Sequence, residues 1–190
     1  MVGINKIWIW HNIFSHSKLD INFIEKYRNK IHKKIYYHLS LNKTLNLEII
    51  NYLGPNNFYW NSISRNIKLT LSFVKKFNHK LNPKELSWNK TLTYEILEYI
   101  GSNKNWNWYH IGENIKLSIP FIKKYLDKLD IEQLSRNTTL TFYMIEYIGL
   151  HKKWSWRWIS SHINLTPIIN PIKVLKTSYN KYSGIKLIVK

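Results

Sequence analysis

Apolar and polar positions along the chain recur at an interval of about 24 residues. A phrase marks each recurrence: an aliphatic residue, Ser, any residue, Asn, two further residues, Leu and a polar residue that is usually Thr. The aliphatic positions are Ile13, Leu39, Ile63, Leu86, Ile111, Leu134 and Ile159. Neighbouring copies therefore lie 26, 24, 23, 25, 23 and 25 residues apart. A fixed period in this range is the signature of a repeat array, and the sequence predicts seven degenerate copies over nearly all of residues 8–170.

The polar residue that closes each phrase is a helix-start signal. These residues are Asp20, Asn46, Thr70, Thr93, Ser118, Thr141 and Thr166. Their side-chain oxygens can accept a hydrogen bond from an unpaired backbone N–H in the first helical turn. A leucine precedes each one, and in six copies an aliphatic residue follows four positions later, which is the hydrophobic staple. Apolar residues three, four and seven positions after the cap complete one stripe of an amphipathic helix.

Two kinds of helix ending are expected. Alternate helices should stop at a glycine that can adopt positive φ, namely Gly54, Gly101 and Gly149. The others are expected to run to Lys30, Lys80 and Lys128. A second start signal at Asn82-Pro83 and at Asp130-Ile131 then predicts a short helix that ends at the next Leu-Ser. Each copy is thus predicted to be a long and a short helix packed as a hairpin and stacked on its neighbours.

The copies alternate in character, which gives a higher-order period of about 48 residues. Six positions after the cap, one kind of copy carries lysine and the other carries tyrosine. The predicted fold is therefore all-α: an α-solenoid of about seven degenerate 24-residue helix-hairpin repeats, with a pair period of about 48. Residues 1–171 are assigned to this repeat domain, and residues 172–190 to a C-terminal cap or basic tail.

Three motifs carry a resemblance to a known group of proteins. They are Trp106-x-Trp108-x-x-Ile111, Leu134-Ser135-x-Asn137 and Phe121-Ile122-Lys123-Lys124-Tyr125. In these motifs the chain resembles the tandem Trp/Asn-rich helical-repeat proteins of giant DNA viruses of amoebae, mimivirus relatives in particular. The resemblance covers most of the chain. It implies a viral helical-repeat protein located in the host cytoplasm or the virion, and it transfers no functional residue.

Composition narrows the function classes. The net charge is +18, which favours an acidic partner such as nucleic acid. However, 25 lysines stand against 4 arginines, a bias that AT-rich coding also produces, and arginine is the residue preferred for bidentate phosphate contacts. The absence of cysteine excludes disulfides. No secretory signal is visible, and no apolar run reaches the roughly 20 residues that cross a bilayer.

The ends of the chain bear on its partners. Residues 1–12 begin in mid-repeat and are rich in apolar side chains. Because the end of a solenoid needs a polar cap or a partner, this end indicates self-association, a protein contact or a missing upstream segment.

The tryptophans have two interpretations. They could form a stacking platform for bases, or they could fill the wedge between successive hairpins. The second is favoured for the periodic clusters, because a periodic apolar position is typical of a core. Trp88 and Trp158 depart from that pattern, and we expect both to be exposed contact residues.

The lysines of alternate helices form the second candidate surface. Lys26, Lys75, Lys76, Lys123 and Lys124 would line up as a basic ridge that a polyanion could follow. The competing interpretation is a solvated face whose lysines complement helix C-termini, and the lysine-rich composition favours it.

No constellation of an enzyme is visible. The asparagines of the phrase are expected to bond neighbouring backbone groups. The eight histidines show no metal-ligand spacing, and there is no phosphate loop or nucleophile elbow. The sequence predicts no cofactor, no small-molecule ligand and no membrane partner. It predicts a non-enzymatic scaffold or adaptor for another macromolecule, most simply a protein; the alternative is a nucleic-acid-binding protein that uses the lysine ridge.

Overall fold

Every regular element in the described part of the chain is a helix. The computed structural model describes residues 9–163. This range contains thirteen α-helices and three 3-10 helices and no strand, so the all-α prediction is confirmed. The cap predicted at Thr166, the boundary at residue 171 and the tail 172–190 lie outside the described residues.

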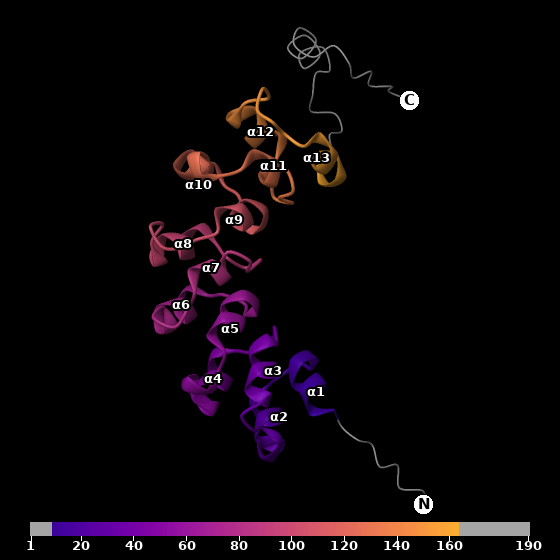
Figure 1. The fold of residues 1–190 in the computed structure, drawn as a ribbon, viewed down its shortest axis with the longest axis vertical. Coiled ribbons are helices and arrows are strands. Elements are labelled where there is room, and N and C mark those ends of the chain that lie inside the picture. Colours follow the sequence, from indigo (N-terminus) through magenta and orange to yellow (C-terminus); the bar gives the residue numbers. More distant parts are fainter. Residues whose placement is uncertain (1–8, 164–190) are drawn as a thin grey trace, which may run out of the picture.

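The helices form two arcs that run side by side along a crescent (Figure 1). The odd-numbered helices lie on the inner, concave arc: α1 (Trp10–His16), α3 (Ile35–Leu41), α5 (Trp60–Asn66), α7 (Pro83–Leu86), α9 (Trp108–Asn114), α11 (Ile131–Leu134) and α13 (Trp156–His162). The even-numbered helices lie on the outer arc: α2 (Ile21–Lys26), α4 (Leu47–Leu53), α6 (Leu71–Phe77), α8 (Tyr94–Ile100), α10 (Ile119–Tyr125) and α12 (Phe142–Ile148). Inner helices contact the next inner helix from α1 to α7 and again between α9 and α11.

The predicted caps begin the outer helices. The side chains of Asp20, Asn46, Thr70, Thr93, Ser118 and Thr141 each accept a hydrogen bond from the backbone N–H three residues later. The leucine before each of them and the staple residue four positions after it are buried. Burial of these two residues fixes the angle at which the chain enters the helix, so the phrase places each outer helix.

The helices are shorter than predicted. Three of them were expected to reach Lys30, Lys80 and Lys128, but α2, α6 and α10 end at Lys26, Phe77 and Tyr125. A turn or a 3-10 helix follows, and then comes a buried residue that leaves the helical conformation, as Ile31 and Leu129 do. These extended residues lead the chain back to the inner arc. The predicted short helices are confirmed in two copies: α7 and α11 follow the caps Asn82 and Asp130, have four residues each and end just before a serine. The other inner helices have seven residues, as most outer helices do, so in those copies the expected contrast of a long and a short helix is wrong.

The other predicted helix endings are correct. Gly54, Gly101 and Gly149 end α4, α8 and α12 with φ of 85°, 100° and 115°. At Gly149 an added Cβ would also lie 2.6 Å from the His151 ring. Glycine is required here because residues with a side chain rarely adopt such φ values.

The core lies between the two arcs. Outer helices contribute the residues three, four and seven positions after the cap, as Phe73, Val74 and Phe77 do in α6. The inner arc contributes the aliphatic residue of each phrase, and Ile63 is fully buried. Phe58, Trp106 and Trp154 are buried in the connections, and the indole N–H groups of Trp106 and Trp154 donate to the carbonyls of Gly101 and Gly149. These three side chains lie in the core, as the sequence favoured, but Tyr59 and Trp156 of the same clusters keep 47% and 45% of their surface accessible, so the prediction is wrong for those two.

Three buried asparagines join one copy to the copy before it. Asn89 uses all of its hydrogen-bonding capacity. Its Nδ2 donates to the carbonyls of Ser64 and Ile67, both at 2.9 Å, and its Oδ1 accepts from the backbone and hydroxyl of Thr91. The Thr91 hydroxyl in turn accepts from the N–H of Leu69 at 2.9 Å. Asn42 with Thr44 and Asn137 with Thr139 make the same bonds. We call this Asn–Thr arrangement the clamp.

Candidate interaction surfaces

Both tryptophans that the sequence singled out are exposed. Trp88, just after α7, and Trp158, in α13, each keep 40% of their surface accessible. An arginine covers one face of each ring: the guanidinium carbon of Arg65 lies 5.0 Å from the Trp88 centroid, and that of Arg136 lies 4.8 Å from Trp158. Such cation–π contacts hold the rings in place.

Trp88 is the more constrained of the two tryptophans. Arg65 also pairs with Glu85 at 2.7 Å, and the ring of His110 packs against the indole of Trp88. Burial lowers the pKa of His110, and Arg65 adds to this effect while Glu113 opposes it. His110 is therefore mostly neutral near pH 7 and contributes a flat aromatic surface to the stack.

Further exposed aromatic side chains continue along the inner arc. Tyr37 in α3 and Tyr59 just before α5 pack edge to face with centroids 5.3 Å apart. Tyr109 in α9 packs edge to face on His110. We call the following residues the aromatic–arginine band: Tyr37, Tyr59, Arg65, Trp88, Tyr109, Arg136 and Trp158. Sequence reasoning found only its tryptophans, although Arg65 and Arg136 occupy the same variable position of the repeat as Trp88.

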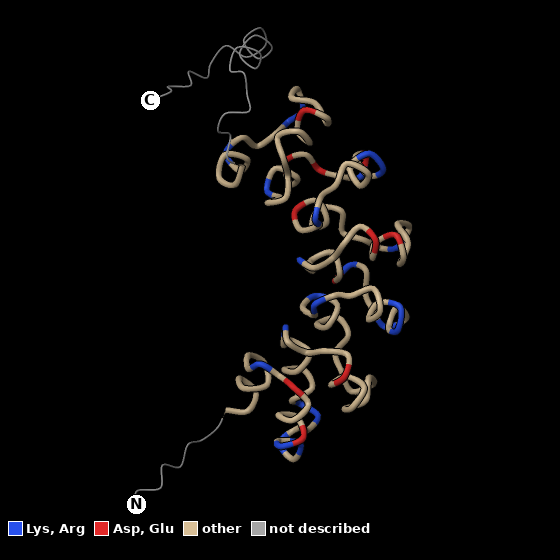
Figure 2. The backbone as a smooth tube through the Cα atoms, turned by 180° about the vertical axis from the view of Figure 1, so that it is seen from behind, with Lys and Arg blue, Asp and Glu red and all other residues tan. Residues whose placement is uncertain are grey.

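The predicted ridge lysines lie on the outer arc and are exposed: Lys26, Lys75, Lys76, Lys123 and Lys124. Carboxylates interrupt them. The outer helices and their caps hold these five lysines and six acidic residues, which are Asp20, Glu25, Glu48, Glu95, Glu98 and Glu146. Figure 2 shows blue and red segments together along the convex side. The ridge is therefore not a continuous positive surface.

One ridge lysine is already paired. The ammonium of Lys124 and the hydroxyl of Tyr125 both donate to the carboxylate of Glu98 on the neighbouring outer helix α8. Partial burial alone would raise the pKa of Glu98, but these two hydrogen bonds outweigh it and lower that pKa. The bond to Glu98 raises the pKa of Lys124. This ammonium is therefore neutralised locally and is less available to a polyanion than the other ridge lysines.

The outer arc also exposes tyrosines at the position that carries lysine in alternate copies. Tyr52, Tyr99 and Tyr147 keep 44–47% of their surface accessible. The ammonium of Lys75 lies 5.9 Å from the Tyr99 ring centroid. The sequence pattern placed these tyrosines correctly on the repeat but did not identify them as surface residues.

Metal-binding clusters and membrane-spanning helices are absent from residues 9–163. No group of three histidine, cysteine or carboxylate side chains there could hold a metal ion. No helix in the same range is long and apolar enough to cross a bilayer.

Comparison with known proteins does not place the chain in a family. No family model, no curated protein and no solved structure matches it. The interpretation of these surfaces therefore rests on the chain's own residues.

Proposed function

We propose that this chain is a non-enzymatic α-solenoid that binds another macromolecule, a protein, as a scaffold or adaptor. About seven degenerate 24-residue helix-hairpin repeats, alternating with a pair period of about 48, account for its architecture. The recurrence of the clamp at Asn42, Asn89 and Asn137 supports that reading. Stacked repeats of this kind create extended concave surfaces, and the inner arc is such a surface.

The aromatic–arginine band is the observation on which the proposal rests. Tyrosine, tryptophan and arginine are the residues most enriched at the energetic centres of protein interfaces. Here the aromatic residues are exposed along one arc, and contacts such as those of Arg65 and the half-buried Arg136 with the tryptophans hold them in place. A surface that is ordered before binding loses less side-chain entropy when a partner docks, so the band favours a protein partner or a second copy of the chain.

The second candidate is nucleic-acid binding through the lysine ridge. Its support is the exposure of Lys26, Lys75, Lys76 and Lys123 on alternate outer helices. The intervening carboxylates weaken it, because a polyanion that follows the ridge also meets Glu25, Glu98 and Glu146. Binding to an oligonucleotide that falls with salt and with Lys→Glu replacement at Lys75, Lys76, Lys123 and Lys124 would favour this function instead.

A capture experiment with matched variants tests the scaffold proposal. The wild-type protein is expected to retain specific proteins from a lysate of its native source. Replacing both Trp158 and Arg136 by Ala should weaken their binding at least about tenfold, because truncation of an interface centre costs about 2 kcal/mol or more. The control is Tyr147→Ala on the outer arc, which should retain the same proteins. Equal retention by all three forms, or no specific retention by any, would overturn the proposal.

Origin and location are a separate proposal. We propose, on the Trp/Asn-rich motifs alone, that the chain is a giant-virus repeat protein that acts in the host cytoplasm or the virion. Localisation of the tagged protein in infected cells checks this expectation.

A further inference from the structure

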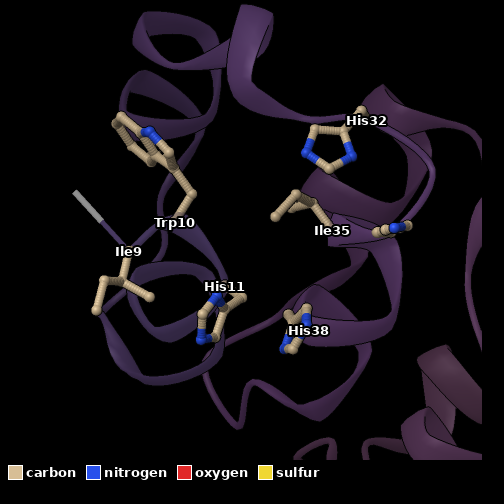
Figure 3. A pocket seen from close by; sticks show the side chains of 7 residues that line it. Ile9, Trp10, His11, His32, Ile35 and His38 are labelled. Atoms are coloured by element: carbon tan, nitrogen blue, oxygen red, sulfur yellow. The ribbon is translucent and has the colours of Figure 1, made fainter. Parts of the chain in front are cut away.

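A cavity of about 400 Å³ opens between α1 and α3 near the start of the described chain (Figure 3). It is lined by Ile9, Trp10, His11, His32, Lys34, Ile35 and His38. Ile35 forms a buried apolar floor, and the imidazoles of His32 and His38 lie on either side of it. The volume is within the range of about 300–1,000 Å³ that is typical of small-molecule pockets.

The polar lining of this cavity can only be neutral or positive. His11 comes from α1, His32 and Lys34 come from the segment before α3, and His38 comes from α3 itself. These are all the titratable groups that line it, and no carboxylate is among them. The rings of His11 and His38 lie 5.3 Å apart, so two protonated rings would repel each other unless an anion lay beside them.

A contact with Ser15 favours one tautomer of the His38 ring. The Ser15 hydroxyl donates its only proton to the carbonyl of His11 at 2.8 Å. Its oxygen lies 3.1 Å from Nδ1 of His38 and can therefore only accept from it. With the hydroxyl proton on that carbonyl, Nδ1 carries the hydrogen of the Ser15 contact, and Nε2 is the nitrogen left for a ligand. That atom becomes a donor when the ring is protonated.

Burial, and then the charge of His11, lower the pKa of His38 from its ordinary value of 6.5. An anion beside the ring would oppose both effects, because it favours the charged form of the His38 imidazole. Ligand binding and protonation of His38 are therefore coupled in this cavity.

We propose that this cavity binds a phosphate group, free or as a small monoester. A phosphate carries close to two negative charges and offers several acceptor oxygens. That charge and number of acceptors fit a lining of three imidazoles and one ammonium better than a carboxylate would. The inference is independent of the scaffold function and stands or falls on other residues.

Titration of the histidine ring protons by NMR tests the site, with inorganic phosphate and phenyl phosphate as probes. Addition of either should raise the pKa of His38, because a bound anion favours the charged form of its ring. His38→Gln and His11→Gln should each weaken binding about tenfold, because each removes a charge-assisted hydrogen bond. The tighter of the two probes identifies whether the cavity takes free or esterified phosphate.

The control is His79→Gln, which removes an exposed histidine that does not line the cavity and should leave binding unchanged. Sodium chloride at matched ionic strength should not shift the two histidines. The proposal would be overturned by equal shifts with chloride or by unchanged binding in folded His38→Gln and His11→Gln.

Discussion

The asparagine of the repeated phrase makes different hydrogen bonds in alternate copies. Asn42, Asn89 and Asn137 are buried and bond to carbonyls 22 to 28 residues earlier in the chain. Asn66 and Asn114 are half-buried and donate only to a carbonyl four residues earlier in their own helix. The joints between copies are therefore of two kinds. One kind is held by a clamp, and the other is held by apolar packing and by hydrogen bonds of the serines in the repeated phrase.

The cause is the residue two positions after the asparagine. In the clamped copies it is Thr44, Thr91 or Thr139, whose hydroxyl bridges the asparagine and a backbone N–H of the preceding copy. In the other two copies a lysine stands there, Lys68 or Lys116. A lysine side chain has no acceptor and cannot make that bridge. The helix ends differ as well, because Asn66 and Asn114 are the last residues of α5 and α9, whereas the clamp asparagines lie beyond the ends of their helices.

The largest difference is expected between Asn89→Ala and Asn66→Ala. Loss of Asn89 leaves the carbonyls of Ser64 and Ile67 and the Thr91 amide without their buried partner, which should cost about 3 kcal/mol. Loss of Asn66 removes one half-exposed bond and should cost about 1 kcal/mol or less. Urea unfolding measures both. Equal losses would show that the clamp does not hold the joint.

A smaller difference separates two threonines of the same loop. Thr91→Val removes the acceptor of the Leu69 N–H and is expected to cost about 2 kcal/mol. Thr93→Ala removes the cap of α8 and should cost about 1 kcal/mol. Thermal unfolding of the two variants ranks them, and the opposite order would mean that helix starts matter more than the joints.

Stability is expected to depend on pH through His110, which lies in an unclamped copy. His110 in α9 has a pKa below 6.5, mainly because it is buried. Above pH 6.5 the ring is neutral in the folded and in the unfolded protein, and the folded state then has no cost from a buried charge on His110. As pH falls through 6.5 towards the folded value, the unfolded chain takes up the proton first and stability falls. Urea unfolding should show this loss, and His110→Gln should reduce it; an unchanged pH profile in that variant would contradict the assignment.

The smallest effect is expected on the outer arc. Lys124→Gln breaks the ion pair with Glu98, but Lys124 is exposed and such pairs add little to stability. Its midpoint of thermal unfolding should be close to that of the wild type. A loss as large as that of Asn89→Ala would show that outer-arc ion pairs also hold the copies together.

Local signals in the sequence predicted much of the fold. Each described cap, from Asp20 to Thr141, begins the expected helix, because a cap and a staple act within one helical turn. The endings at Lys80 and Lys128 were wrong because the chain must return to the inner arc, and that requirement comes from packing between copies. Periodicity along one helix contains no information about where the next helix lies.

The candidate surfaces were predictable to a lesser extent. Trp88 stands at a position that varies among copies, and this indicated its exposure correctly. Its stack with Arg65 and His110 joins residues 23 and 22 positions away from it in the chain, which no local pattern reveals. The lysine ridge was predicted from the positions of the lysines alone. Its net positive charge is lost once the carboxylates of the outer helices and their caps are counted.

The clamp has a consequence for how the protein is made. Each asparagine finds its partners in chain that has already been synthesised, none more than 28 residues behind it. Two-turn helices do not persist alone in water, yet a nascent chain could fasten every second copy to its predecessor as soon as that copy leaves the ribosome. The folded part of the chain can therefore extend from the N-terminus towards the C-terminus during synthesis, before the C-terminal residues have been made.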